Sequence, residues 1–287
     1  MPITITRRAA AAGIAALTVA RFPASAGASE TAALRRRINV AGRQRMLTQR
    51  MVMAAAFARL DIDADAHIAI LADANALFSQ SLAALRNGDA ALGLPASTKP
   101  EVIARLDAVD GVWAKLGPVA DEIAARAVVT KADIGALAVV EEDARALSDA
   151  VVTALETAYG DAASSARLNI CGRQRMLTQK MAKEAALMGL SYRRADNKRA
   201  LGETIELFER SLSALIEGDR SLDVAASPEA AQAHLSAGAA RWTDLKPALE
   251  DMAERGDADL FDLEIVAEER DLLLAEMNAA VEALETA

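Results

Sequence analysis

Residues 38–51 carry two apolar stripes at helical spacing. On a helix of 100° per residue, the two stripes lie on nearly opposite sides. A surface helix has one apolar face, so a helix with two is expected to be buried on both. One stripe would then pack in its own bundle and the other against a partner helix. The first stripe holds Ile38, Gly42, Arg45, Gln49, Val52 and Ala56, and the second holds Val40, Leu47, Met51 and Ala54.

The same stretch returns about 130 residues later, at residues 168–181, and ten of its 14 positions are identical. INVAGRQRMLTQRM becomes LNICGRQRMLTQKM, so the substitutions are mostly swaps among apolar residues, plus Arg50 for Lys180. A helix that served only core packing would more often keep its apolar residues and vary its polar ones. The unchanged Asn, Arg, Gln and Thr positions therefore indicate a function for the polar residues.

Later segments repeat at the same offset of 130 or 129, for example Trp113 with Trp242 and residues 154–157 with 283–286. The alanine-rich composition, with 3% aromatic residues and few prolines, is typical of an all-α protein. We therefore predict two tandem up-down four-helix bundles, residues 29–159 and 160–287.

Local signals place several helix ends. Thr98 to Glu101 form a capping-box sequence that predicts the start of a third helix, and Thr130 with Asp133 predicts a fourth that runs to about Tyr159. Gly160-Asp161 is a natural break, because glycine ends helices and aspartate caps the next one.

Residues 1–28 have the pattern of an export signal peptide. Arg7-Arg8 precede a short apolar run, and a small-residue cleavage site ends at Ala26. Both the twin-arginine (Tat) route and the Sec route fit this pattern. The apolar run is too short to cross a bilayer, and no other segment approaches a membrane span. We therefore expect a periplasmic protein.

The formal net charge is −9, and cleavage after Ala26 removes three arginines and leaves −12. Such an acidic protein is a poor partner for nucleic acid. Basic residues nevertheless gather on the two copies of the motif helix, so the local field there can be positive: Arg35, Arg36, Arg37, Arg43, Arg45, Arg50, Arg167, Arg173, Arg175 and Lys180.

The sequence holds little that could catalyse a reaction. His67 and His234 have no matching partner in the other repeat, and Cys171, the only cysteine, is expected to pack as a small apolar residue. No phosphate-binding loop, nucleophile elbow or convincing metal-ligand spacing is present. We therefore predict a protein that is not an enzyme and has no metal or other cofactor.

The Gly-x-x-Arg steps, Gly42 to Arg45 and Gly172 to Arg175, suggest a binding site. A missing side chain one turn before a guanidinium leaves a space with planar donors at its edge, which suits flat oxyanions. Neutral hydrogen bonds would come from the amide residues Asn39, Asn169, Gln49 and Gln179. A second interpretation stays open: Arg45 pairs with a carboxylate of a neighbouring helix, and Gly42 only permits close packing.

At these residues the sequence resembles the PilJ-type, or NarX-like, periplasmic sensor domain, whose first helix carries Asn-x-Ala-Gly-x-x-Arg-Met. Residues 39–46 match this pattern fully, and residues 169–176 depart from it only at Cys171. The resemblance implies a helical bundle of sensor kinases and chemoreceptors. It also implies nitrate or nitrite held between two first helices by the glycine and arginine, here Gly42, Arg45, Gly172 and Arg175.

The resemblance and the duplication lead to two expectations. If the two motif helices run parallel, the chain forms an internal pseudo-dimer around one anion; pairing between chains in a homodimer is the alternative. Because the signalling domains usual in this family are lacking, the signal would pass to a partner, such as a membrane sensor or a transporter. The rival hypothesis is a structural adaptor that docks a partner helix and binds no small molecule.

Overall fold

The computed structural model describes residues 26–159, 162–222 and 224–287, and 86% of the structure is helical. The described residues contain two isolated bridges, Asp89 with Leu94 and Asp219 with Val224, and no strand. The helices are α1 (Ala26–Arg59), α2 (Ala64–Asn87), α3 (Pro100–Arg126), α4 (Lys131–Tyr159), α5 (Ala162–Gly189), α6 (Arg194–Glu217), the short 3-10 helix η1 (Arg220–Leu222), α7 (Glu229–Arg255) and α8 (Leu260–Thr286).

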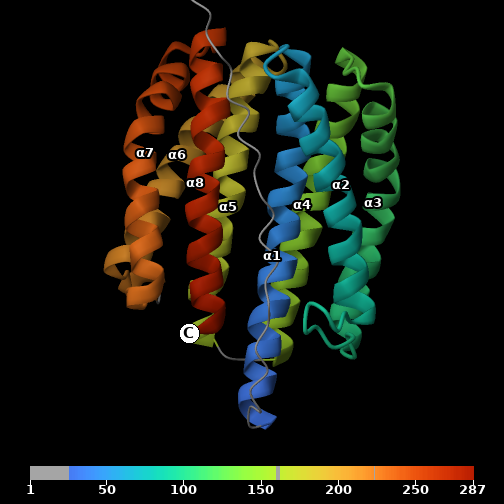
Figure 1. The fold of residues 1–287 in the computed structure, drawn as a ribbon, viewed down its shortest axis with the longest axis vertical. Helices are drawn as coiled ribbons and strands as arrows, with labels where there is room; N and C mark the ends of the chain where they lie inside the picture. The colour runs from blue at the N-terminus through green and yellow to red at the C-terminus, as the bar shows by residue number, and fades with distance from the viewer. Residues whose placement is uncertain (1–25, 160–161, 223) are drawn as a thin grey trace, which may run out of the picture.

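The helices form two up-down four-helix bundles, α1–α4 and α5–α8, as the repeat predicts (Figure 1). The two motif helices, α1 and α5, lie side by side between the bundles and run in the same direction (Figure 1). Each also packs on helices of its own bundle, α1 on α2 and α4, and α5 on α6 and α8. The parallel arrangement required for an internal pseudo-dimer is therefore present.

Burial on both sides of the motif helices follows from their two apolar stripes. In α1, every side chain in residues 51–57 is buried, and in α5 this holds for residues 184–188. The apolar residues of both bundles belong to one continuous core, to which the two central helices contribute Leu47, Met51, Leu177 and Met181. Burial of this apolar surface is what holds the two repeats together.

Two of the predicted helix starts have different outcomes. The Thr130 hydroxyl accepts from the Asp133 N–H at 3.2 Å, and the Asp133 carboxylate accepts from the Thr130 N–H at 2.6 Å, so this capping box is confirmed. The capping box at Thr98 is wrong. The helix begins at Pro100, and Lys99 occupies the N-cap with extended backbone (φ −86°, ψ 119°) and no side-chain cap bond. Proline at the first helical position fixes this start and leaves Thr98 outside it.

Two predicted features lie outside the described residues. These are the export signal over residues 1–25 and the break between the repeats at Gly160-Asp161. Helix α1 already begins at Ala26, so residues 26–28, which we assigned to the signal, belong to the first turn of the motif helix.

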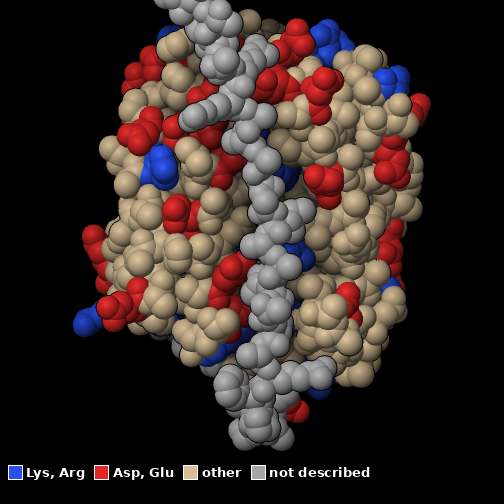
Figure 2. All heavy atoms as spheres, in the orientation of Figure 1, with Lys and Arg blue, Asp and Glu red and all other residues tan. Residues whose placement is uncertain are grey.

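One described helix, α2, is long and apolar enough to cross a membrane by length and composition. This corrects the expectation that no segment beyond the N-terminus approaches a span. In the structure α2 packs between α1 and α3, and its apolar side chains Leu71, Phe78, Leu82 and Leu85 belong to the core. The face of the molecule in Figure 2 carries many acidic side chains, in keeping with the net charge of −9.

Candidate functional site

The two Gly-x-x-Arg steps meet at the interface between α1 and α5. A Cβ atom placed on Gly42 would lie 3.1 Å from Nη2 of Arg45 and 3.8 Å from Nη2 of Arg175. On Gly172 it would lie 3.4 Å from Nη2 of Arg175 and 3.8 Å from Nη2 of Arg45. Both guanidinium groups therefore converge on the same pair of glycines. The missing side chains leave the space that the two arginine ends occupy, so the two copies form one arginine cluster.

Arg45 is buried, with 1% of its surface exposed, but its charge is compensated. Its Nη1 donates to Oδ1 of Asp149 on α4 at 2.5 Å, and its Nη2 donates to Oδ1 of Asn169 on α5 at 2.8 Å. Burial lowers the pKa of Arg45, and the neighbouring Asp149 carboxylate opposes that shift. The carboxylate partner that we considered for Arg45 is therefore present.

Arg175 lies in the matching position but has no such partner. Its Nη2 donates to the backbone carbonyl of Asn39 at 3.3 Å, its Nε has no hydrogen-bond partner, and it forms no ion pair within the described residues. The repeat explains the difference, because the position equivalent to Asp149 on α8 is Asn278. Burial lowers the pKa of Arg175 to about 10. The group remains charged at neutral pH, so the cluster of two arginines and one aspartate is positive.

The two asparagines of the motif act on the arginines in different ways. Asn169 accepts from Arg45 through its side chain, whereas Asn39 accepts from Arg175 through its backbone carbonyl. Their amide nitrogens donate to equivalent carboxylates, Asn169 to Glu156 at 3.0 Å and Asn39 to Glu285. Each asparagine is thereby fixed against the last helix of a bundle, which in turn orients the arginine it contacts.

The two predicted glutamines lie one turn further along and form no hydrogen bond with Arg45 or Arg175 within the described residues. Gln49 donates to Glu141 of α4, and Gln179 accepts from Arg50 at 3.2 Å. The Oε1 atom of Gln49 and the Nε2 atom of Gln179 have no hydrogen-bond partner within the described residues. The structure therefore places Gln49 and Gln179 beside the arginine cluster but not in it.

Sequence reasoning missed the carboxylates that face the motif helices from α4 and α8. Asp149 pairs with Arg45, and Glu141, Glu156 and Glu285 contact the motif amides. The only available signal was the repeat itself, in which Glu156 corresponds to Glu285 at the offset of 129.

The cysteine and the two tryptophans pack in or against the hydrophobic core. Cys171 is fully buried, and this burial raises the pKa of its thiol to about 12, which suits a small packed residue better than a reactive thiolate. The rings of Trp113 and Trp242 pack on Phe78 and Phe208, with centroids 3.8 and 4.7 Å apart. The described residues contain no group of three or more His, Cys, Asp or Glu side chains placed to hold a metal ion.

Two parallel first helices that meet through matching Gly-x-x-Arg steps define a tandem helical-bundle protein with an internally paired site. The model of the family PilJ, the type IV pili methyl-accepting chemotaxis transducer N-term, matches residues 31–138 and again 157–265. Because these matches cover most of the chain, the protein belongs to the PilJ family and contains its domain twice. No curated protein and no solved structure matches the chain.

Membership confirms the resemblance to the PilJ domain and the tandem duplication. The family consists of N-terminal domains of membrane chemotaxis transducers and is not a catalytic family, which supports a role in sensing or signalling with a membrane partner. Such domains are typically periplasmic.

Proposed function

We propose that this protein is a periplasmic sensor that binds one small oxyanion between α1 and α5, with nitrate or nitrite preferred. The observation that carries the proposal is Arg175, a buried guanidinium beside two glycines that has no carboxylate partner within the described residues. The bound form would signal to a partner, either a membrane-bound sensor or a transport system.

The charge balance at the glycines supports an anion. Nη2 of Arg45 and Nη2 of Arg175 both approach the same two glycines, yet Asp149 compensates only one of the two charges. A buried charge without a partner is costly, and two like charges close together add to that cost. A flat oxyanion would accept planar hydrogen bonds from the guanidinium groups and offset the excess charge. Chloride, a sphere without this planar match, should bind more weakly.

The arginine cluster is reached from solvent at Arg45. A cleft of about 390 Å³ is lined in part by Arg45, Asp149 and Arg173. Arg175 does not line this cleft, and the Asp149 side chain, 45% exposed, is the more accessible partner of the ion pair. An anion entering here would meet Arg45 and Asp149 first and would have to displace the Asp149 carboxylate to bind between the two arginines.

The adaptor hypothesis has one observation in its favour, the Arg45–Asp149 ion pair. Against it stands the position of α5, which covers the stripe of α1 that was expected to receive a partner helix. A docking partner would have to use another face of the molecule. We therefore prefer the anion-binding function for the motif helices.

Calorimetric titration with nitrate and nitrite tests the proposal, with chloride and acetate as comparison anions. We expect one oxyanion per chain, and at least a tenfold loss of affinity in both Arg45→Ala and Arg175→Ala, because each removes charge-assisted hydrogen bonds to the anion. Arg167→Ala is the matched control, since Arg167 lies on the same helix but donates to the backbone carbonyl of Ala225. A folded wild-type protein that binds neither oxyanion would exclude the proposal, and binding that survives in both variants would place the anion elsewhere.

A further inference from the structure

A second candidate site lies outside the motif interface, in a cleft of about 450 Å³ formed by α4, α5 and α6. Volumes of 300 to 1,000 Å³ are usual for small-molecule sites. Charged side chains of both signs line the cleft, among them Glu141, Arg145, Lys180, Lys183, Glu184 and Glu203. Arg145, Lys180 and Glu203 also line the cleft at Arg45, but Arg45, Arg175 and the two motif glycines do not line this one.

The duplication provides a comparison for this cleft within the same chain. The equivalent cleft of about 380 Å³ lies between α2 and α8 and includes His67 and Arg270. At the offset of 130, Lys183 and Glu184 correspond to Met53 and Ala54, which are fully buried apolar residues. A motif helix can therefore pack with apolar side chains at these two positions. Lys183 and Glu184 of α5 are thus not needed for helix packing and require a different explanation.

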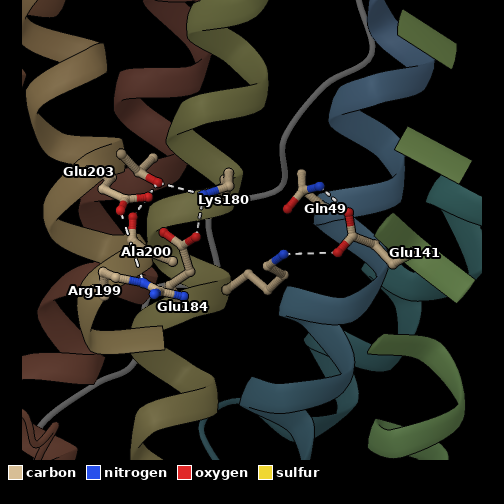
Figure 3. Close-up of polar contacts among 9 residues, drawn as sticks. Gln49, Glu141, Lys180, Glu184, Arg199, Ala200 and Glu203 are labelled. Carbon is tan, nitrogen blue, oxygen red and sulfur yellow. Dashed lines mark hydrogen bonds and ion pairs between the residues drawn. The ribbon is translucent and has the colours of Figure 1, made fainter. Parts of the chain in front are cut away.

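Glu184 is almost completely buried, with 2% of its side chain exposed, and its bonding is incomplete. One carboxylate oxygen, Oε1, accepts from Lys180, which also donates to Thr204 at 2.6 Å (Figure 3). The other oxygen, Oε2, has no hydrogen-bond partner within the described residues. A buried carboxylate oxygen without a donor costs free energy, so this atom indicates a missing ammonium or hydroxyl donor.

The cleft also contains an arginine without a partner. Arg145 of α4 is half-buried and lines the cleft, and it forms no hydrogen bond or ion pair within residues 26–159, 162–222 and 224–287. The neighbouring carboxylate of Glu141 is already used, because it accepts from Lys183 at 2.8 Å and from Gln49 of the motif helix α1 (Figure 3). An unpaired guanidinium is a natural receptor for a carboxylate, which it binds through two parallel hydrogen bonds.

We propose that this cleft binds a small zwitterion, an α-amino acid, whose ammonium group donates to Oε2 of Glu184 and whose carboxylate accepts from Arg145. The Oε2 atom of Glu184 lacks a donor and Arg145 lacks a carboxylate partner within the described residues, and a single ligand with both charges supplies both. Burial raises the pKa of Glu184 while Lys180 and Lys183 oppose that shift, so a bound ammonium would further favour the ionised carboxylate.

Calorimetric titration with each of the twenty common L-amino acids is the first test. We expect saturable binding of at least one of them, with one site per chain. For that amino acid, the amine that lacks the carboxylate and the acid that lacks the ammonium should each bind at least tenfold more weakly. A folded protein that binds none of the twenty would overturn the proposal. An amine or acid that binds as well as the amino acid would instead indicate a simple cation or anion site.

Two substitutions taken from the other repeat make the test specific. Glu184→Ala introduces the residue of position 54, and Arg145→Leu introduces the residue of position 274, so both variants should fold. Each should lower amino-acid affinity at least tenfold. Glu184→Ala should also leave nitrate binding unchanged, because Glu184 lines only this cleft, whereas Arg145 also lines the cleft at Arg45 and its variant tests amino-acid binding alone. Glu268→Gln is the control, because Glu268 lines the equivalent cleft between α2 and α8.

Circular dichroism and the thermal midpoint would confirm the fold of each variant, and Glu184→Gln would replace Glu184→Ala if the latter unfolds. Unchanged amino-acid affinity in folded Glu184 and Arg145 variants would exclude this cleft. Because the oxyanion test depends on Arg45 and Arg175, the two proposals can fail independently.

Discussion

Two arginines with the same motif around them have different electrostatic environments. Arg45 and Arg175 occupy equivalent positions, and each lies over both glycines. What differs is one residue on the last helix of each bundle, Asp149 on α4 and Asn278 on α8. This single difference leaves one guanidinium paired and the other without a carboxylate, and it is the physical basis for an anion at the pseudo-symmetric centre.

The charge argument can be tested by stability. Replacing a buried ion pair by apolar residues of similar volume is often neutral or stabilising by about 1–4 kcal/mol, and a buried charge without a partner is costlier still. We therefore expect Arg175→Met to leave the free energy of unfolding unchanged or to raise it. Asp149→Asn should lower it by about 1–3 kcal/mol, because it removes the counter-charge of Arg45 from a pair that is only partly exposed. Urea denaturation in anion-free buffer measures the free energy of unfolding of both variants. A larger decrease in Arg175→Met than in Asp149→Asn would show that the charge of Arg175 does not destabilise the folded protein.

At this scale, the sequence identified the residues on the motif helices but not their partners. Gly42, Arg45, Gly172 and Arg175 could be predicted because their spacing on one helix is fixed by helical geometry. Asp149 could not, since its contact with Arg45 depends on how α4 is rotated and shifted against α1. Gln49 and Gln179 share the stripe of the arginines, but one turn of helix separates their side-chain ends from the site.

At the scale of elements, the burial of the motif helices on two sides places α1 and α5 against each other and against their own bundles. Helix periodicity and the internal repeat correctly placed residues 38–51 and 168–181 on helices, here α1 and α5, and local signals predicted α4 to about Tyr159. The start of α3 was wrong because Pro100 moved the cap by one residue. The parallel packing of α1 on α5 could be stated only as a condition, because helix periodicity shows which faces are apolar but not the relative direction of two packed helices.

The two motif glycines should respond differently to alanine. A Cβ atom on Gly172 would make ordinary contacts of 3.4 Å or more, so Gly172→Ala should stabilise α5 by about 1 kcal/mol or less. On Gly42 it would lie 3.1 Å from Nη2 of Arg45, which Asp149 and Asn169 hold in place. We expect Gly42→Ala to gain no stability and to lower oxyanion affinity at least tenfold. Thermal unfolding and nitrate titration of both variants check this, and equal effects of the two would show that the site is symmetric.

On the scale of the whole molecule, a contact between α2 and α8 also joins the two bundles. Arg270 of α8 reaches across to His67 of α2, with Nη2 2.8 Å from Nε2 of the imidazole. The other ring nitrogen, Nδ1, lies 2.7 Å from the carbonyl oxygen of Ile62. Nδ1 therefore carries the proton and Nε2 accepts from Arg270, an arrangement that requires neutral His67. Beyond the α1–α5 interface, this contact helps to hold the first repeat against the second.

The contact makes stability depend on pH in a defined direction. Burial and then the charge of Arg270 lower the pKa of His67 from its usual 6.5. Below about pH 6.5 the unfolded chain therefore binds more protons at this residue than the folded protein does, so its contribution to stability is complete above that pH and is lost as the pH falls towards the folded pKa. We expect the free energy of unfolding, measured with urea, to decrease as the pH falls from 8 to 5. In His67→Gln, which retains an acceptor for Arg270 and does not titrate, the decrease should be smaller. An identical profile in His67→Gln would show that this inter-bundle contact does not control the pH dependence.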